Sequence, residues 1–171
     1  MKKIIYNYDN ISNDEINNIV KRARALIVNS DSEILFGYAD KTYHLIGGHL
    51  EGNEDYLDCL IREVREESGI LLNVSNITPF LQIEYYSKDY PDEGVNTKNV
   101  INYYIIKTDM KPDSSKMELT DEEKEWNYTV KYIYKDKALK VLKDNIKFAK
   151  NKAAVYDTME AVIEYLRIED E

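Results

Sequence analysis

The sequence predicts an α/β sandwich, because short strand-like segments and amphipathic helical segments are mixed within one short chain. At 171 residues the chain is long enough to bury a hydrophobic core without disulfides or metal staples. It contains no internal repeat, no low-complexity tract and no Pro/Gly-rich linker. We therefore expect one domain spanning residues 1–171.

Composition limits the classes of function. The formal net charge is −9, from 32 acidic and 23 basic residues, which argues against general nucleic-acid binding because that requires a basic surface. No run approaches the roughly 20 apolar residues of a membrane span, and Met1–Asp9 turns polar too soon for a secretory signal. The single cysteine, Cys59, excludes an internal disulfide. We expect a cytoplasmic protein that does not bind membranes.

The first 40 residues predict a strand, a helix and a hairpin. Residues 1–21 are expected to form a short strand and then a helix that starts at Ser12–Glu15. Ala23–Val28 and Ile34–Tyr38 are apolar runs separated by the polar turn 29–32, a pattern typical of a hairpin.

The next segment predicts a strand followed by a helix. Tyr43–Ile46 is a strand candidate that Gly47-Gly48 would end, and residues 54–68 have helical periodicity. Asn53 is a suitable N-cap and Gly69 a suitable residue just past the C-terminus. One apolar stripe is expected to be buried: Leu57, Leu60, Ile61 and Val64.

The second half predicts three strands and two helices. An acidic connection over Lys111–Glu125 is expected to separate the second strand from the third. The strands are expected at Ile77–Tyr86, Val100–Thr108 and Thr129–Tyr134, and the helices near 135–148 and 152–167. The last helix is amphipathic, so it either closes the core of its own domain or forms a homodimer contact.

Three carboxylates on the helix at 54–68 carry the chemical signal. Glu63 and Glu67 lie about 40° apart around the helix axis, and Glu66 about 60° from Glu63, so all three share one flank. Like charges at this spacing repel unless something compensates. A solvated acidic face is the plain interpretation, and a Mg²⁺ site is the functional one, because Mg²⁺ binds carboxylate oxygens.

The surrounding residues favour the metal site. From Gly48 the chain resembles the signature of the Nudix hydrolase superfamily, GX5EX7REUXEEXGU, in which U is aliphatic. Every specified position is matched, by Gly48, Glu54, Arg62, Glu63, Val64, Glu66, Glu67, Gly69 and Ile70. The resemblance extends over about residues 20–140, with C-terminal helices at about 135–167, and implies an α/β/α sandwich with a mixed β-sheet. One departure is Ile46, where many members have proline.

The resemblance also implies roles for these residues. Glu63 and Glu67 would be the principal metal ligands, Glu66 would assist, and the backbone carbonyl of Gly48 would reach the metal. Arg62 would pair with box carboxylates, either Glu54 or Glu66.

Further candidates come from other segments. A general base would be a box glutamate or an acid of the loop before the last strand, where Glu122 and Glu123 are favoured. Glu84 and Tyr86 lie on the strand after the box, where the family often builds its substrate pocket, although sheet packing is the stronger interpretation for Tyr86. Trp126 either stacks on a base or packs in the protein.

The remaining reactive side chains decide little. His44 and His49 flank the double glycine, and nothing around them has the spacing of a zinc site. Cys59 is interpreted as a small packing residue.

The predicted function is hydrolysis of a phosphoanhydride bond in a nucleoside diphosphate linked to some group X, with Mg²⁺, for which Mn²⁺ can substitute. The partner would be a small-molecule nucleotide, and the protein either a monomer or a homodimer. Two alternatives stay open: a non-hydrolytic nucleotide sensor, and isomerisation of an isoprenyl diphosphate, since a fold does not fix a reaction.

Overall fold

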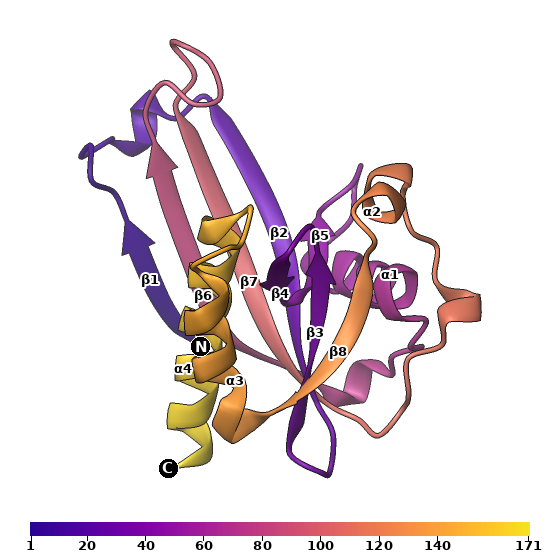
Figure 1. The fold of residues 1–171 in the computed structure, drawn as a ribbon. Coiled ribbons are helices and arrows are strands. Elements are labelled where there is room, and N and C mark those ends of the chain that lie inside the picture. Colours follow the sequence, from indigo (N-terminus) through magenta and orange to yellow (C-terminus); the bar gives the residue numbers. More distant parts are fainter.

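The computed structural model describes residues 1–171 and has the predicted α/β character, with helices on both sides of a mixed sheet (Figure 1). The strands are β1 (Lys2–Tyr6), β2 (Asn18–Val28), β3 (Glu33–Ala39), β4 (Thr42–His44), β5 (Ile46–His49), β6 (Ile77–Ser87), β7 (Thr97–Lys107) and β8 (Thr129–Tyr134). The helices are α1 (Tyr56–Ser68), α2 (Asp121–Glu125), α3 (Lys135–Asn145) and α4 (Lys152–Glu169). Three 3₁₀ turns are η1 (Asn13–Glu15), η2 (Val74–Asn76) and η3 (Ser114–Lys116).

Strand β2 is the axis of the sheet, whose order is β1-β6-β7-β2-β3-β4, with β8 paired to β3. It pairs in parallel with β7 along its whole length. Its other edge is divided, because Arg22–Ala25 pair with β5 whereas Ile27 and Val28 pair with β3. The sheet therefore opens where β5 and β3 diverge, and this opening positions the functional site.

The two faces of β2 belong to two separate cores, because successive side chains of a strand point to opposite faces. Ala23, Ala25 and Ile27 join the cluster that packs under α1. Leu26 and Val28 join the larger cluster that α3 and α4 cover. Helices on opposite faces of one sheet make the predicted three-layer sandwich (Figure 1).

Helix α1 begins two residues later than the sequence suggested. Its N-cap is Asp55 rather than Asn53, because the Asp55 carboxylate accepts hydrogen bonds from the amides of Leu57 and Asp58 at 2.8 and 2.9 Å. The helix ends at Gly69, which adopts the left-handed conformation with φ of 72°, as predicted. Leu60 and Val64 of the expected stripe are fully buried together with Cys59.

Two expected boundaries were wrong near the N-terminus. The helix expected after Ser12 is only the single turn η1, although Ser12 and Glu15 form its capping box, because the chain from Asn18 is extended and pairs with β7. The glycines expected to end a strand lie instead inside β5, where Gly47 and Gly48 pair with β2. Pairing with a neighbouring strand overrides local propensity in both cases.

The acidic connection over 111–125 is also more structured than expected. It contains η3 and the short helix α2, which starts at Thr120 with a capping box to Glu123. Farther along the chain, α4 closes the core of its own sheet, because Val155, Val162 and Tyr165 are fully enclosed. No helix combines the length and the apolar character that crossing a membrane would require.

Candidate active site

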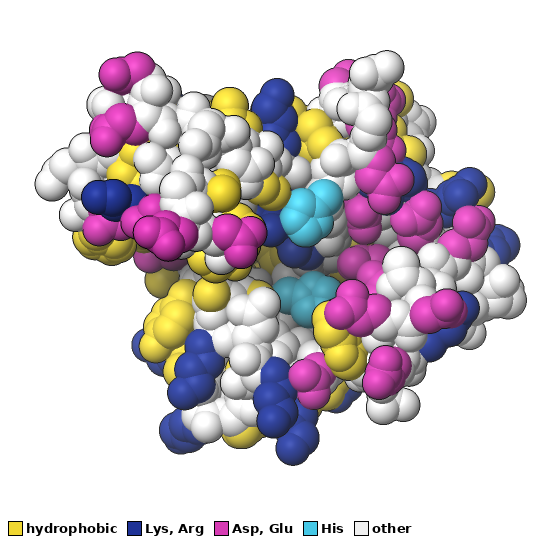
Figure 2. Space-filling view, turned by 90° about the horizontal axis from the view of Figure 1, so that it is seen from above, with side chains coloured by type: hydrophobic (Ala, Val, Ile, Leu, Met, Phe, Trp, Pro, Cys, Tyr) yellow, Lys and Arg dark blue, Asp and Glu magenta, His cyan; other side chains and the backbone are white.

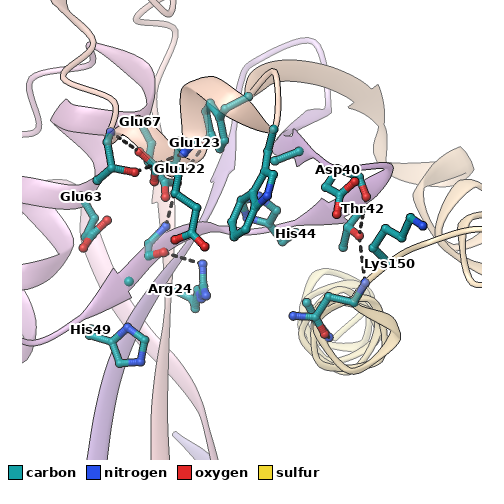
Figure 3. Close-up of a pocket in the computed structure, with 18 of the residues that line it drawn as sticks. Arg24, Asp40, Thr42, His44, His49, Glu63, Glu67, Glu122, Glu123 and Lys150 are labelled. Atoms are coloured by element: carbon teal, nitrogen blue, oxygen red, sulfur yellow. Dashed lines mark hydrogen bonds between the residues drawn. The ribbon is translucent and has the colours of Figure 1, made fainter.

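A cavity of about 560 Å³ lies at the opening of the sheet (Figure 3). Its wall is built from β2, the β3–β5 segment, α1, α2 and the start of α4, so it joins segments that are far apart in the sequence. Glu63 and Glu67 lie toward one end, and Lys150 and Asp40 toward the other (Figure 3). Figure 2 shows the two histidines in a central hollow, beside basic side chains, with acidic side chains along one side of the hollow.

Glu67 is the most enclosed carboxylate of the cavity, with only 5% of the residue exposed. One carboxylate oxygen accepts hydrogen bonds from the Gly47 amide at 3.2 Å and from the Tyr128 hydroxyl at 3.0 Å. Burial raises the pKa of Glu67 to about 8, despite the opposing effect of the nearby Arg24 charge. The Gly47 amide and the Arg24 charge only partly offset the cost of burying this carboxylate, so a bound cation would stabilise its charged form further.

Glu63 lies one helical turn before Glu67 and packs directly against the backbone of Gly48. A Cβ atom placed on Gly48 would lie 2.3 Å from the nearer Glu63 oxygen, so only glycine leaves this space free. Burial raises the pKa of Glu63, although its salt bridge to Arg62 opposes the shift. The structure therefore brings together Glu63 and the backbone of Gly48, two residues that the sequence assigns to the same metal site.

Arg62 forms a clamp on the outer side of α1. Its guanidinium donates to both carboxylate oxygens of Glu54, at 2.6 and 3.0 Å, and to the backbone carbonyl of His49 at 3.0 Å. It also bonds Glu63 at 2.8 Å and Glu66 at 3.1 Å. Both predicted partners are present, and the clamp ties the loop before α1 to the helix.

Glu66 differs from the other two box glutamates because it does not line the cavity. Its carboxylate is engaged by Arg62, and its backbone carbonyl accepts a hydrogen bond from the Glu118 amide. No group of three or more His, Cys, Asp or Glu side chains is close enough together to hold a metal ion by itself. The side chains that face the cavity from α1 are thus Glu63 and Glu67.

These residues nevertheless fit a divalent cation. Mg²⁺ is commonly held by one or two carboxylates, with waters and substrate phosphates completing its coordination. Glu63 and Glu67 supply two carboxylates from one helix flank, and the missing Cβ of Gly48 leaves a cradle beside Glu63. Oxygen donors of this kind suit Mg²⁺ or Mn²⁺ better than a softer metal.

Helix α2 brings the predicted loop acids to the end of the cavity where the α1 carboxylates lie. Glu122 and Glu123 both line the cavity, on the side of Glu67 and Arg24 (Figure 3). The Glu123 carboxylate accepts a hydrogen bond from the Thr120 amide at 2.7 Å, so it serves first as a helix cap. Glu122 is exposed and free of such a bond. Trp126 lines the same cavity with 42% of its surface exposed.

Glu84 and Tyr86 lie away from this cavity. Glu84 is buried in an ion network on the sheet, with Lys3 at 2.8 Å and Lys98 at 3.2 Å. Tyr86 donates a hydrogen bond to the Glu84 carboxylate at 3.3 Å. Their alternation along β6 directs both side chains to the same face, where they stabilise the sheet.

The two histidines and the cysteine are arranged around the double glycine. His49 lines the cavity, and burial followed by the charges of Arg22 and Arg24 lowers its pKa. His44 packs near Tyr128, and burial lowers its pKa to about 4. Cys59 is enclosed, and burial raises the pKa of its thiol to about 11, which agrees with a packing role.

Sequence reasoning missed Arg24 and the far wall of the cavity. Arg24 lines the cavity, and one of its terminal nitrogens donates to the carbonyls of Leu45, at 2.9 Å, and Gly47. The available signal was a charged residue between Ala23 and Ala25, within the otherwise apolar run Ala23–Val28. Nothing in the sequence signalled Lys150 or its neighbours, because only the tertiary fold brings α4 to the cavity.

Comparisons with known proteins agree with this geometry. Residues 19–150 match the family described as NUDIX domain. A search of curated proteins finds no match.

Similar solved structures include a study of MutT from Aliivibrio salmonicida and Vibrio cholerae, with 17% identity, a TM-score of 0.52, and coverage of 84% of this chain and 95% of that one. A C. elegans Ap4A hydrolase binary complex has 18% identity and a TM-score of 0.53, covering 88% and 98%. The MutT NUDIX hydrolase from Burkholderia pseudomallei has 19% identity and a TM-score of 0.52, covering 70% and 86%. At these identities the likeness shows the shared fold.

The family match spans most of the chain and contains the complete box, the α1 carboxylates and the cavity that they face. The chain therefore belongs to the Nudix hydrolase family, whose members generally hydrolyse nucleoside diphosphate derivatives.

Proposed function

We propose that this protein hydrolyses a phosphoanhydride bond in a nucleoside diphosphate linked to a group X, using Mg²⁺, with Mn²⁺ as a substitute. The observation that carries the proposal is the placement of Glu63 and Glu67 on one wall of the cavity, beside the side-chain-free backbone of Gly48. When bound there, the cation would neutralise phosphate charge and lower the pKa of a bound water.

The chain's own residues would hold and orient the reacting groups. Glu63 and Glu67 would bind the cation with the Gly48 carbonyl, and Glu66 would assist through water. Arg62 would keep Glu63 in place through its 2.8 Å ion pair, since its other contacts fix the guanidinium. Glu122 would take the proton of the attacking water, because it faces the cavity and its carboxylate is not used as a helix cap.

The cavity also suits the nucleoside part of such a substrate. Its volume falls in the range of roughly 300 to 1,000 Å³ that is usual for small-molecule sites. Trp126 offers a half-exposed indole on its wall, and a planar base would stack on such a ring.

Product analysis tests the proposal directly. A panel of nucleoside diphosphate derivatives would be incubated with Mg²⁺, Mn²⁺ or EDTA, with wild type and with Glu67→Gln. We expect metal-dependent cleavage of at least one compound, and a loss of several orders of magnitude in the variant, since the cation site would be incomplete. Glu118→Gln is the control, because its exposed carboxylate contacts only Arg65 outside the cavity.

Two results would count against the proposal. One is near-normal turnover in Glu67→Gln, and the other is the absence of cleavage across the panel despite nucleotide binding, which would favour a sensor. Thermal unfolding gives a second readout that does not depend on finding the substrate. Mg²⁺ at about 100 times its Kd would stabilise wild type by about 2.7 kcal/mol, and Glu67→Gln much less.

A further inference from the structure

Two arginines of β2 lie side by side on one face of the strand, and one of them, Arg24, lines the cavity. Arg22 and Arg24 are separated by one residue, so both point to the α4 side of the sheet, above Leu26. In the β2–β5 register, Arg22 is opposite His49 and Arg24 is opposite Gly47. This face of β2 is therefore apolar at Leu26 and cationic at Arg24 and Arg22.

Each guanidinium leaves most of its donors free. Arg22 uses one terminal nitrogen to donate to the Asn99 side chain at 2.7 Å. Arg24 uses one terminal nitrogen for the carbonyls of Leu45 and Gly47. The remaining nitrogens of both have no protein partner, and they are not sealed in, because the one enclosed side-chain polar atom without a partner is the Tyr132 hydroxyl. An incoming ligand can therefore reach them.

Neither guanidinium forms an ion pair, although the chain has nine more acidic than basic residues. The acid on the facing helix, Asp157 of α4, accepts the hydroxyl hydrogen of Tyr85 at one carboxylate oxygen and lies close enough to influence the charge of both arginines. Burial and then the adjacent Arg24 charge lower the pKa of Arg22. Asp157 offsets part of this charge, but no acid pairs directly with either guanidinium, so two partly buried like charges side by side keep donors for an anion from outside the chain.

The position of the pair relative to the carboxylates defines which anion fits. Arg24 and His49 line the same cavity as Glu63 and Glu67 (Figure 3). Gly47 connects the two groups, because its amide donates to Glu67 and its carbonyl accepts from Arg24. A polyphosphate chain that starts at the carboxylate wall would extend along the β5 backbone toward the arginines. A guanidinium group binds two phosphate oxygens through two parallel hydrogen bonds, and this paired geometry selects for phosphate.

We propose that Arg22 and Arg24 form an anion subsite for a phosphoryl group of the substrate other than the one held at Glu63 and Glu67. The subsite rests on the proposed function, and it names the residues that would hold the phosphoryl group lying farther from the cation. Arg22 is its dedicated member, whereas Arg24 also fixes the strand that carries Gly47.

The test measures anion binding without metal. Inorganic tripolyphosphate would be titrated calorimetrically into the whole protein in EDTA, with wild type, Arg22→Gln and Lys21→Gln. Lys21 is the matched control, because it lies next to Arg22 on the same strand, is exposed, points to the opposite face and carries the same charge. We expect Arg22→Gln to weaken binding at least tenfold and Lys21→Gln to change it less than twofold.

Three outcomes would overturn the subsite: no saturable binding by wild type at millimolar tripolyphosphate, unchanged binding by Arg22→Gln, or equal weakening by both variants. Equal weakening would mean that the overall electrostatic field of the protein attracts tripolyphosphate, rather than a specific site. Circular dichroism would check folding, and Arg22→Lys gives a second variant that keeps the charge but not the two-nitrogen fork. It should bind more weakly than wild type and more tightly than Arg22→Gln.

Kinetics separate this proposal from the proposed function. On a cleaved substrate, Arg22→Gln should raise KM about tenfold with kcat changed less than threefold, whereas Glu67→Gln lowers kcat. If Glu67→Gln is inactive and Arg22→Gln binds and reacts like wild type, only the subsite fails. If Glu67→Gln retains full turnover, the proposed function fails whatever tripolyphosphate does.

Discussion

The hydroxyl of Tyr128 donates a hydrogen bond to the buried carboxylate of Glu67 at 3.0 Å. The two residues are far apart in the sequence and meet because the chain enters β8 directly after α2. On its other side, the Tyr128 hydroxyl packs against Gly37, where a Cβ would lie 2.8 Å from it. The phenol is therefore fixed between a strand and the carboxylate, and it determines where that carboxylate points.

Tyr128→Phe should lower kcat about five- to thirtyfold, which corresponds to about 1 to 2 kcal/mol for one hydrogen bond that positions a charged group. KM should change little, because the hydroxyl orients Glu67 and does not hold the nucleoside. Tyr132→Phe is the control, since the Tyr132 hydroxyl is buried without a partner. Steady-state kinetics give kcat and KM for both variants. Similar losses of kcat in the two would contradict a positioning role for Tyr128.

Gly48→Ala should reduce activity at least tenfold while the protein still folds. The new Cβ would lie 2.3 Å from a Glu63 oxygen, so the carboxylate must move, and displacements of about 1 Å at a reacting centre cost up to about a hundredfold. Gly94→Ala is the comparison, because its backbone has a φ of 81° but a Cβ there would meet nothing. Gly94→Ala should lower the free energy of unfolding and retain activity. Full activity in Gly48→Ala together with a loss of activity in Gly94→Ala would contradict a role for the space beside Gly48.

Arg62→Lys should impair both catalysis and folding, because an ammonium cannot reproduce the two-nitrogen contact with Glu54 and the bonds to Glu63 and His49. We expect a loss of about 1 to 3 kcal/mol in the free energy of unfolding and at least a tenfold fall in kcat. Arg65→Lys, one turn away in a single exposed ion pair, should be nearly silent. Urea unfolding measures the loss of stability, and steady-state kinetics measure the loss of kcat. Equal losses in Arg62→Lys and Arg65→Lys would contradict the proposed clamp by Arg62.

Glu67 should make the metal-free protein less stable as pH rises. Its pKa is about 8 in the folded state, because of burial, and near 4.5 when exposed, so the folded state binds more protons between these values. Stability in EDTA should therefore fall from about pH 4.5 to 8, and Glu67→Gln should gain on wild type over that window. Urea unfolding at pH 5 and pH 8 measures it, and a constant difference between the proteins would contradict the shift.

Glu164 should show the opposite pH dependence. Its carboxylate is buried between Lys2 and Arg167, and the Arg167 hydrogen bond is the main cause that lowers its pKa to about 2. Its stabilising effect is present above its ordinary pKa of 4.5 and is lost as pH falls toward 2. Glu164→Gln should cost about 1 to 3 kcal/mol at pH 7 and less at pH 3, whereas Asp170→Asn should be neutral at both.

The family and its signature residues were easier to predict from the sequence than the ends of the helices and strands. The box from Gly48 to Ile70 identified the family because its residue types are dictated by local geometry on one helix and one loop. The hairpin and β8 were predicted for a similar reason, since alternation and turn residues are local signals. The helix expected after Ser12 failed because β7, far along the chain, pairs with that segment.

The rest of the site depended on contacts that no local pattern encodes. Trp126 was noticed in the sequence, but its place on the cavity wall follows from the orientation of α2. The assignment of Glu84 as a possible pocket residue depended on its place on the strand after the box, whereas the structure surrounds it with Lys3 and Lys98. Distance along the chain does not specify which face of a strand meets a ligand.

The far wall of the cavity has an implication for how the activity could diversify. Lys150 ends the segment that matches the family, and Asn151 and Ala154, which follow it, belong to the same wall. The carboxylates of α1 and this part of the wall thus lie in separate stretches of the chain. Because Val155, Val162 and Tyr165 of α4 belong to the core, changes confined to Asn151 and Ala154 would reshape this wall while leaving the carboxylate helix untouched.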